Sequence, residues 1–177
     1  MTGEELTRLL TGPFLAACAL LAVAGATKVM RPASARAAAQ ALHLPGDSRA
    51  IRVLGGVELA VAVSGACFGG WAAAAVAATY VLLTAAAFSL WRSAPGTPCG
   101  CLGASPTPAT GGHVALNAIA ATIAAVVATG PTPISVLGDQ PLLGIPFLVL
   151  TACATWLGAL AMDALPALGA AVHEGSS

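Results

Sequence analysis

Long apolar stretches are the feature of this sequence that most restricts its fold. Residues 51–91 form one apolar run whose only charged side chains are Arg52 and Glu58. A helix needs about 20 mostly apolar residues to cross the hydrocarbon core of a bilayer, so this run is long enough for about two crossings. Gly69 and Gly70 lie near its middle. They predict a tight turn between two spanning helices, over 51–69 and 71–91.

Three more stretches have the length and composition of spanning helices: 9–30, 113–130 and 141–162. Only 8% of the 177 residues are charged and 58% are hydrophobic, whereas an ordinary soluble domain has about 25% charged residues. The sequence therefore predicts an all-α fold, an integral membrane bundle of about five helices forming a single domain over 1–177. A soluble enzyme and a disordered chain are excluded. Zero net charge and 5% aromatic residues also argue against nucleic-acid binding.

The segment 31–52 is basic, with four arginines against one acid, Asp47. Residues 32–44 within it have the spacing of an amphipathic helix at the membrane interface, closed by Pro45 and Gly46. With the predicted spans, this segment lies on the same side of the membrane as segment 92–112. The positive-inside rule makes that side cytoplasmic, whereas a disulfide in 92–112 favours the outside, because cytosolic thiols are kept reduced. Both orientations stay open, with a preference for the outside.

Segment 92–112 contains two cysteines, Cys99 and Cys101, separated by Gly100. A disulfide between them requires a turn, which glycine permits. Such a small ring is strained, and strained disulfides are the labile, catalytic ones. Two alternatives remain: half of a metal site with His113 as a third ligand, or cysteines that serve only as small residues.

Two spans carry charges that need partners. Glu58 lies well inside the second span and Lys28 near the end of the first, on the same side of the bilayer. An ionisable residue inside a membrane is a functional candidate and is expected to be paired. A Lys28–Glu58 ion pair that fixes two helices is favoured over a role in proton transfer.

His113 and Asn117 are four residues apart at the start of the fourth span, so they share one helix face. His113 is predicted at the same membrane surface as Cys101. It is a candidate to accept a thiol proton, and the alternative is a polar residue that caps the helix. Asn117 is predicted to hydrogen-bond between helices.

Three sequence elements together resemble one family of membrane proteins. They are Gly25-Ala26-Thr27-Lys28 at the end of the first span, Gly56-Val57-Glu58-Leu59-Ala60 in the second, and Cys99-Gly100-Cys101-Leu102-Gly103 before the helix that carries Asn117. This pattern resembles the MauE family of methylamine-utilisation proteins, within the broader DoxX-like group.

The resemblance implies a DoxX-like four-helix core with an added span, in the plasma membrane of a bacterium. It also implies that Cys99 and Cys101 exchange electrons with a thioredoxin-like exported protein. The client is then a disulfide-containing protein such as a methylamine dehydrogenase-like subunit. No cofactor or metal is expected, and membrane lipid is the other partner.

The function expected is therefore thiol–disulfide exchange that supports maturation of an exported partner, through the Cys99/Cys101 pair. Whether this makes the protein an enzyme stays open. One alternative is a non-enzymatic membrane scaffold or assembly subunit. A small-molecule transporter coupled through Glu58 is disfavoured, because the sequence has no inverted repeat or paired broken helices.

Overall fold

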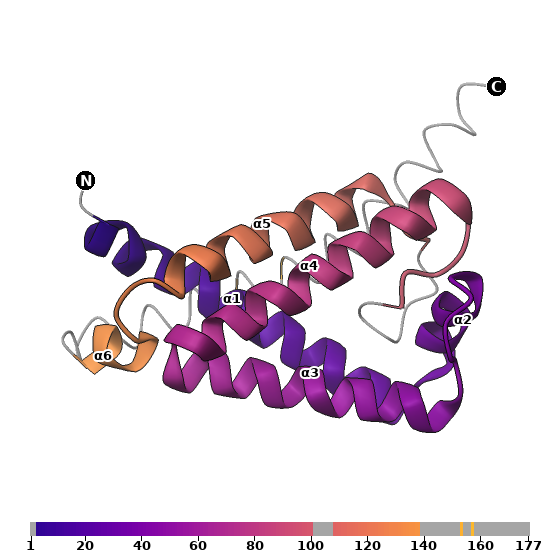
Figure 1. The fold of residues 1–177 in the computed structure, drawn as a ribbon, viewed down its shortest axis with the longest axis horizontal. Helices are drawn as coiled ribbons and strands as arrows, with labels where there is room; N and C mark the ends of the chain where they lie inside the picture. Colours follow the sequence, from indigo (N-terminus) through magenta and orange to yellow (C-terminus); the bar gives the residue numbers. More distant parts are fainter. Residues whose placement is uncertain (1–2, 101–107, 139–152, 154–156, 158–177) are drawn as a thin grey trace.

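The computed structural model describes residues 3–100 and 108–138, together with Cys153 and Leu157. Residues 3–100 and 108–138 hold six helices and no β-strand (Figure 1). The helices are α1 (Gly3–Met30), α2 (Ala33–Ala41), α3 (Ser48–Phe68), α4 (Gly70–Ser93), α5 (Gly111–Val127) and α6 (Pro133–Gly138). An all-α bundle is what the apolar runs predict.

The four long helices lie side by side, with α2 at one end of the bundle and α6 at the other (Figure 1). Helix α1 packs mainly against α3, and α4 packs mainly against α5. Contacts between α3 and α4 and between α1 and α5 close the bundle. Each helix therefore has two neighbours among the four, and the bundle has an interior in which polar side chains can be buried.

Within residues 3–100 and 108–138, three helices are long and apolar enough to cross a membrane: α1, α3 and α4. They match the predicted spans 9–30, 51–69 and 71–91 within a few residues at most ends. The exception is α1, which begins at Gly3. Its first turns pack against the segment that follows α5, since Thr7 is buried and its side chain meets Gly130.

Helix α5 corresponds to the predicted span 113–130 but has 17 residues and ends at Val127, at the lower limit of about 17 residues for a spanning helix. The predicted span 141–162 falls almost entirely outside the described residues. Helix α6 lies in the connection that follows α5.

The turn between α3 and α4 lies where the two glycines predict it. Gly69 has a φ of +60° and Gly70 a φ of +47°, a left-handed conformation that costs glycine little and other residues more. Helix α3 ends at Phe68 and α4 begins at Gly70, so the two form a tight antiparallel pair.

Small residues let the helices approach closely. The position of a Cβ on Gly25 would lie 2.5 Å from the carbonyl oxygen of Gly55. A Cβ on Gly65 would likewise lie 2.5 Å from Cγ2 of Val76. Since lipid supplies no hydrophobic drive between helices, such close van der Waals contact is a main source of their association. Many large apolar side chains, including Val57 and Leu82, are instead exposed, as expected for a surface that faces lipid.

Candidate functional site

The cysteine segment is a loop closed at its base. After α4 ends, the backbone N–H of Ala109 donates to the carbonyl of Thr97 at 3.1 Å. Pro98 and Pro108 form an isolated antiparallel bridge directly beside this bond. These contacts, which we call the neck, hold the two ends of the loop together between α4 and α5. Cys99 follows the neck directly, whereas Cys101 lies outside the described residues.

Cys99 is buried, with 7% of its surface exposed. It belongs to a small apolar cluster with Ala38 of α2, Ala87 and Leu90 of α4, and Ala109 beyond the neck. Val114 of α5 packs against the same cluster. Residues of α2, α4 and α5 therefore pack around Cys99 at one end of the bundle.

Gly100 fixes where this loop sits. Its φ is +67°, and a Cβ at this position would lie 2.8 Å from the Cα of Ala35 and 3.2 Å from the carbonyl carbon of Ser34. The backbone between the two cysteine positions therefore lies directly on the first turn of α2. The basic segment and the cysteine segment share one end of the bundle, as the order of the spans predicts.

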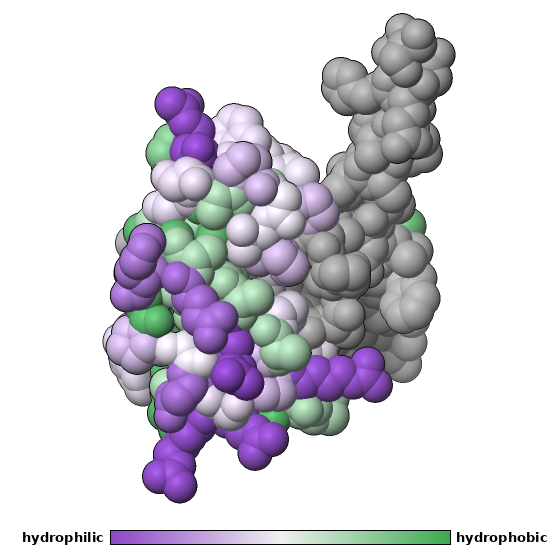
Figure 2. Space-filling view, turned by 90° about the vertical axis from the view of Figure 1, so that its right-hand side faces the viewer, coloured by the Kyte–Doolittle hydropathy of each residue, from purple (hydrophilic) through white to green (hydrophobic). Residues whose placement is uncertain are grey.

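Exposed arginines surround this end of the molecule. Figure 2 looks onto it and shows hydrophilic side chains with apolar surface between them. The exposed basic residues come from the α2 region and from the adjoining helix ends: Arg31, Arg36, Arg49, Arg52 and Arg92. The acid nearest to them in sequence, Asp47, accepts a hydrogen bond from the backbone N–H of Ala50 at the start of α3. This end of the protein is therefore strongly basic.

The structure brings Lys28 and Glu58 together. Lys28 Nζ donates to both carboxylate oxygens of Glu58, at 2.8 Å and 2.6 Å, and both side chains are buried. The Gly25–Gly55 contact lies one turn away on each helix, so the backbones of α1 and α3 are already close at this depth. The geometry matches an ion pair that fixes the two helices.

His113 caps the start of α5. The backbone N–H of Thr110 donates to Nδ1 of His113 at 3.3 Å, and Thr110 Oγ1 lies 2.9 Å from the same nitrogen. Together with the Thr110 side chain, this forms a capping box. A neutral imidazole has one accepting nitrogen, so protonation at Nδ1 would remove the acceptor that Thr110 uses. This geometry favours the alternative predicted for His113, a residue that caps the helix, over a proton acceptor.

Asn117 is buried one turn further along α5. Its side-chain Nδ2 has no hydrogen-bond partner within the described part of the chain. The hydrogen bond between helices that was predicted for Asn117 is thus not seen from this nitrogen among those residues.

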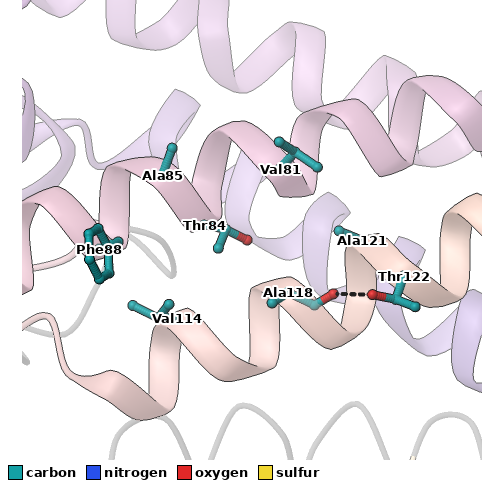
Figure 3. A pocket seen from close by; sticks show the side chains of 8 residues that line it. All are labelled: Val81, Thr84, Ala85, Phe88, Val114, Ala118, Ala121 and Thr122. Carbon is teal, nitrogen blue, oxygen red and sulfur yellow. Dashed lines mark hydrogen bonds between the residues drawn. The ribbon is translucent and has the colours of Figure 1, made fainter.

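An apolar groove of about 470 Å³ runs between α4 and α5 (Figure 3). Val114, which packs on the Cys99 cluster, is one of its lining residues. The Thr84 hydroxyl donates to the carbonyl of Tyr80 and the Thr122 hydroxyl to that of Ala118, so both hydroxyls are engaged with the backbone. The described lining residues carry no ionisable side chain.

The metal-site alternative gains no support in the described ranges. Residues 3–100 and 108–138, with Cys153 and Leu157, contain no group of three His, Cys, Asp or Glu side chains placed to hold a metal ion.

Two contacts at this site were not predicted from the sequence. One is the contact of Gly100 with α2, and the other is a buried hydrogen bond from Tyr80 Oη to the carbonyl of Ala17 at 2.7 Å. Tyr80 is the only tyrosine in the sequence, and its position in an apolar span was a signal that its hydroxyl needs a partner.

The helical bundle, the apolar outer surface and the buried ion pair define a multi-span α-helical membrane protein. The chain belongs to the family described as methylamine utilisation protein MauE, whose sequence pattern matches residues 6–130. This match covers α1 to α5 and includes the neck and both cysteines of the loop. No curated protein and no solved structure matches the chain.

Proposed function

We propose that this protein supports maturation of an exported client by thiol–disulfide exchange through Cys99 and Cys101. The observation that carries the proposal is the placement of Cys99 directly after the neck, followed by a glycine in a left-handed turn. Family membership adds the setting, since the family is named for methylamine utilisation. The client class is then a disulfide-containing exported protein such as a methylamine dehydrogenase-like subunit.

The exchange starts from the oxidised protein, in which Cys99 and Cys101 share a disulfide. A client thiolate attacks one of the two sulfurs, the disulfide of this protein breaks, and the other sulfur leaves as a thiolate. A second client thiolate then attacks the mixed disulfide. The client gains a disulfide, and its two electrons and two protons pass to Cys99 and Cys101. The disulfide of a thioredoxin-like exported partner takes these electrons in turn and restores the starting state.

Gly100 supports this chemistry through its conformation. Extended residues i and i+2 are near the upper limit of the Cα separation that a disulfide tolerates. The φ of +67° at Gly100 turns the backbone between the two cysteines, and a turn shortens that separation.

We place the Cys99 end outside the cytoplasm, in the plasma membrane, because disulfides form and persist there. The exposed arginines around α2 oppose this orientation by the positive-inside rule. In our proposal these arginines bind lipid headgroups at the membrane surface.

The proposal is tested by labelling intact cells with a membrane-impermeant maleimide, before and after an external reductant. Labelling of Cys99 and Cys101 that appears only after reduction supports an oxidised pair on the outside. Labelling only after permeabilisation, with no reductant needed, contradicts it.

Exchange itself is tested by trapping mixed disulfides with partners. The variant C99S/C101S is expected to trap no partner, while C67S serves as the matched control, since Cys67 is exposed near the α3–α4 turn, away from the neck. If C99S/C101S still supports oxidation of the client, the scaffold function is favoured instead.

A further inference from the structure

Helix α2 packs against Cys99 at the basic end of the bundle. In disulfide exchange the attacking sulfur must reach the target sulfur directly, because a bond forms between them. Cys99 is only 7% exposed and shares its cluster with Ala38 of α2 and Leu90 of α4. Helix α4 is a long member of the bundle, whereas α2 has nine residues and lies at its end. Of the described helices around Cys99, α2 is therefore the one that can move with the least disruption of the bundle.

Few buried side chains attach α2 to the rest of the bundle. Ala35 and Ala38 are the buried residues of this helix, and Ala41 and the C-cap Leu42 pack partly buried against the same cluster as Cys99. Three alanines and one leucine remove a limited apolar surface from water or lipid. The hydrogen bond from Arg36 Nε to the carbonyl of Gly46 joins α2 to its own connection with α3 and not to the bundle. That connection contains His43 with a φ of +56°, an uncommon conformation for a residue other than glycine and one suited to a hinge.

The position of α2 depends on the absence of a side chain at Gly100. A Cβ there would lie 2.8 Å from the Cα and 3.0 Å from the nitrogen of Ala35. These are backbone atoms, so the overlap is relieved only if the helix or the loop shifts. Gly100 therefore acts in two ways: it turns the chain between the cysteines, and its lack of a side chain lets the backbone of α2 lie directly against it.

We propose that α2 is a movable cover over Cys99, held closed on Gly100, and that it opens to admit the sulfur of a docking partner. The cover restricts exchange to partners that displace α2 and protects Cys99 from small thiols and oxidants at other times. This inference rests on the proposed function for its purpose, but the cover itself is measurable without any client.

The test compares alkylation rates of Cys99 in the reduced, full-length protein in lipid nanodiscs. N-ethylmaleimide is the probe, and peptide-resolved mass spectrometry follows Cys99 alone. In the unchanged protein Cys99 is expected to react at least about tenfold more slowly than in the denatured chain, as for a site that reacts only in an open minor state. The variant G100A is expected to raise the rate about tenfold by shifting α2 away.

The matched control is G96A. Gly96 lies in the same connection and also has a left-handed φ, +88°, but a Cβ there meets nothing within 4 Å. It introduces the same backbone strain without touching α2, so the alkylation rate should stay within about threefold of the unchanged protein. Equal rates in G100A and G96A would overturn the proposal, as would fast alkylation of Cys99 in the unchanged protein.

Hydrogen exchange gives a second measurement that does not depend on G100A folding well. In the unchanged protein, amides of α2 are expected to exchange faster than those of α1 and α3, in keeping with local opening. Protection of α2 equal to that of α3 would also overturn the cover.

If C99S/C101S still supports exchange, the proposed function fails while the cover stands. If Cys99 is unprotected but required for exchange, the proposed function stands and the cover fails.

Discussion

Lys28 and Glu58 join α1 to α3 beside the point where the two helices come closest. Lys28 Nζ lies 2.8 Å and 2.6 Å from the two carboxylate oxygens of Glu58. The Cβ position of Gly55 lies only 2.9 Å from the Cβ of Lys28. The glycine contact and the ion pair therefore depend on each other, because a wider separation of the backbones would pull the charges apart.

Removing one member of this pair should destabilise the bundle strongly. We expect E58L or K28M alone to lower the free energy of unfolding by about 3–5 kcal/mol, because the remaining charged group stays buried without its partner. The double variant K28M/E58L should recover most of this loss. Unfolding titrations in mixed micelles measure all three variants, and additive losses in the double variant would contradict an energetically coupled pair.

The close approach of α1 and α3 gives a second prediction with a neighbouring control. G55A places a Cβ 2.6 Å from the carbonyl oxygen of Gly25, whereas G56A meets nothing within 4 Å. We expect G55A to cost about 1–3 kcal/mol through overpacking. G56A should be neutral or slightly stabilising, because alanine favours a helix over glycine. The same micelle titration applies, and equal effects of the two variants would refute the contact.

Tyr80 supplies a buried hydrogen bond between α4 and α1. Its hydroxyl donates to the carbonyl of Ala17 at 2.7 Å. Y80F keeps the ring and removes the hydroxyl that makes this bond, so the expected loss of stability is about 0.5–1.5 kcal/mol. Thermal unfolding followed by circular dichroism is sufficient to detect it. An unchanged midpoint would show that the bond contributes nothing net.

The role of His113 is tested by a substitution that keeps the helix cap and removes the imidazole ring. Glutamine is a usual residue at this position of a capping box, so H113Q should remain within about 0.5 kcal/mol of the unchanged protein, while H113A should lose about 1 kcal/mol. Since Nδ1 is engaged with Thr110, we expect H113Q to exchange disulfides at an unchanged rate. Loss of exchange in a stable H113Q protein would instead establish His113 as the proton acceptor.

The features that follow from local patterns could be predicted from the sequence. Apolar length located α1, α3 and α4, and two adjacent glycines located the turn before α4. The placement of Lys28 and Glu58 on the same side of the bilayer, in consecutive spans, pointed to their pairing, because a buried charge has few other options. Membership of the MauE family was expected from residue motifs and is confirmed.

Features that depend on how helices meet were not predictable. Alanine and glycine are so frequent in the spans that many helix faces are equally suited to packing, so the sequence does not single out Gly25 and Gly55. The early start of α1 was missed because hydropathy marks the apolar crossing and not the end of the helix. The contact of Gly100 with α2 joins segments far apart in the chain, and no local pattern reports it.

The neck between Thr97 and Ala109 closes the cysteine loop at its base. The ends of α4 and α5 are therefore joined by a backbone hydrogen bond that uses no side chain from the insert between Pro98 and Pro108. Two residues of that insert nevertheless contact the helices, since Cys99 packs with Ala38 and Leu90 and Gly100 lies against Ala35. A graft of another loop onto this bundle must therefore keep Cys99 and Gly100 if α2 is to stay in place.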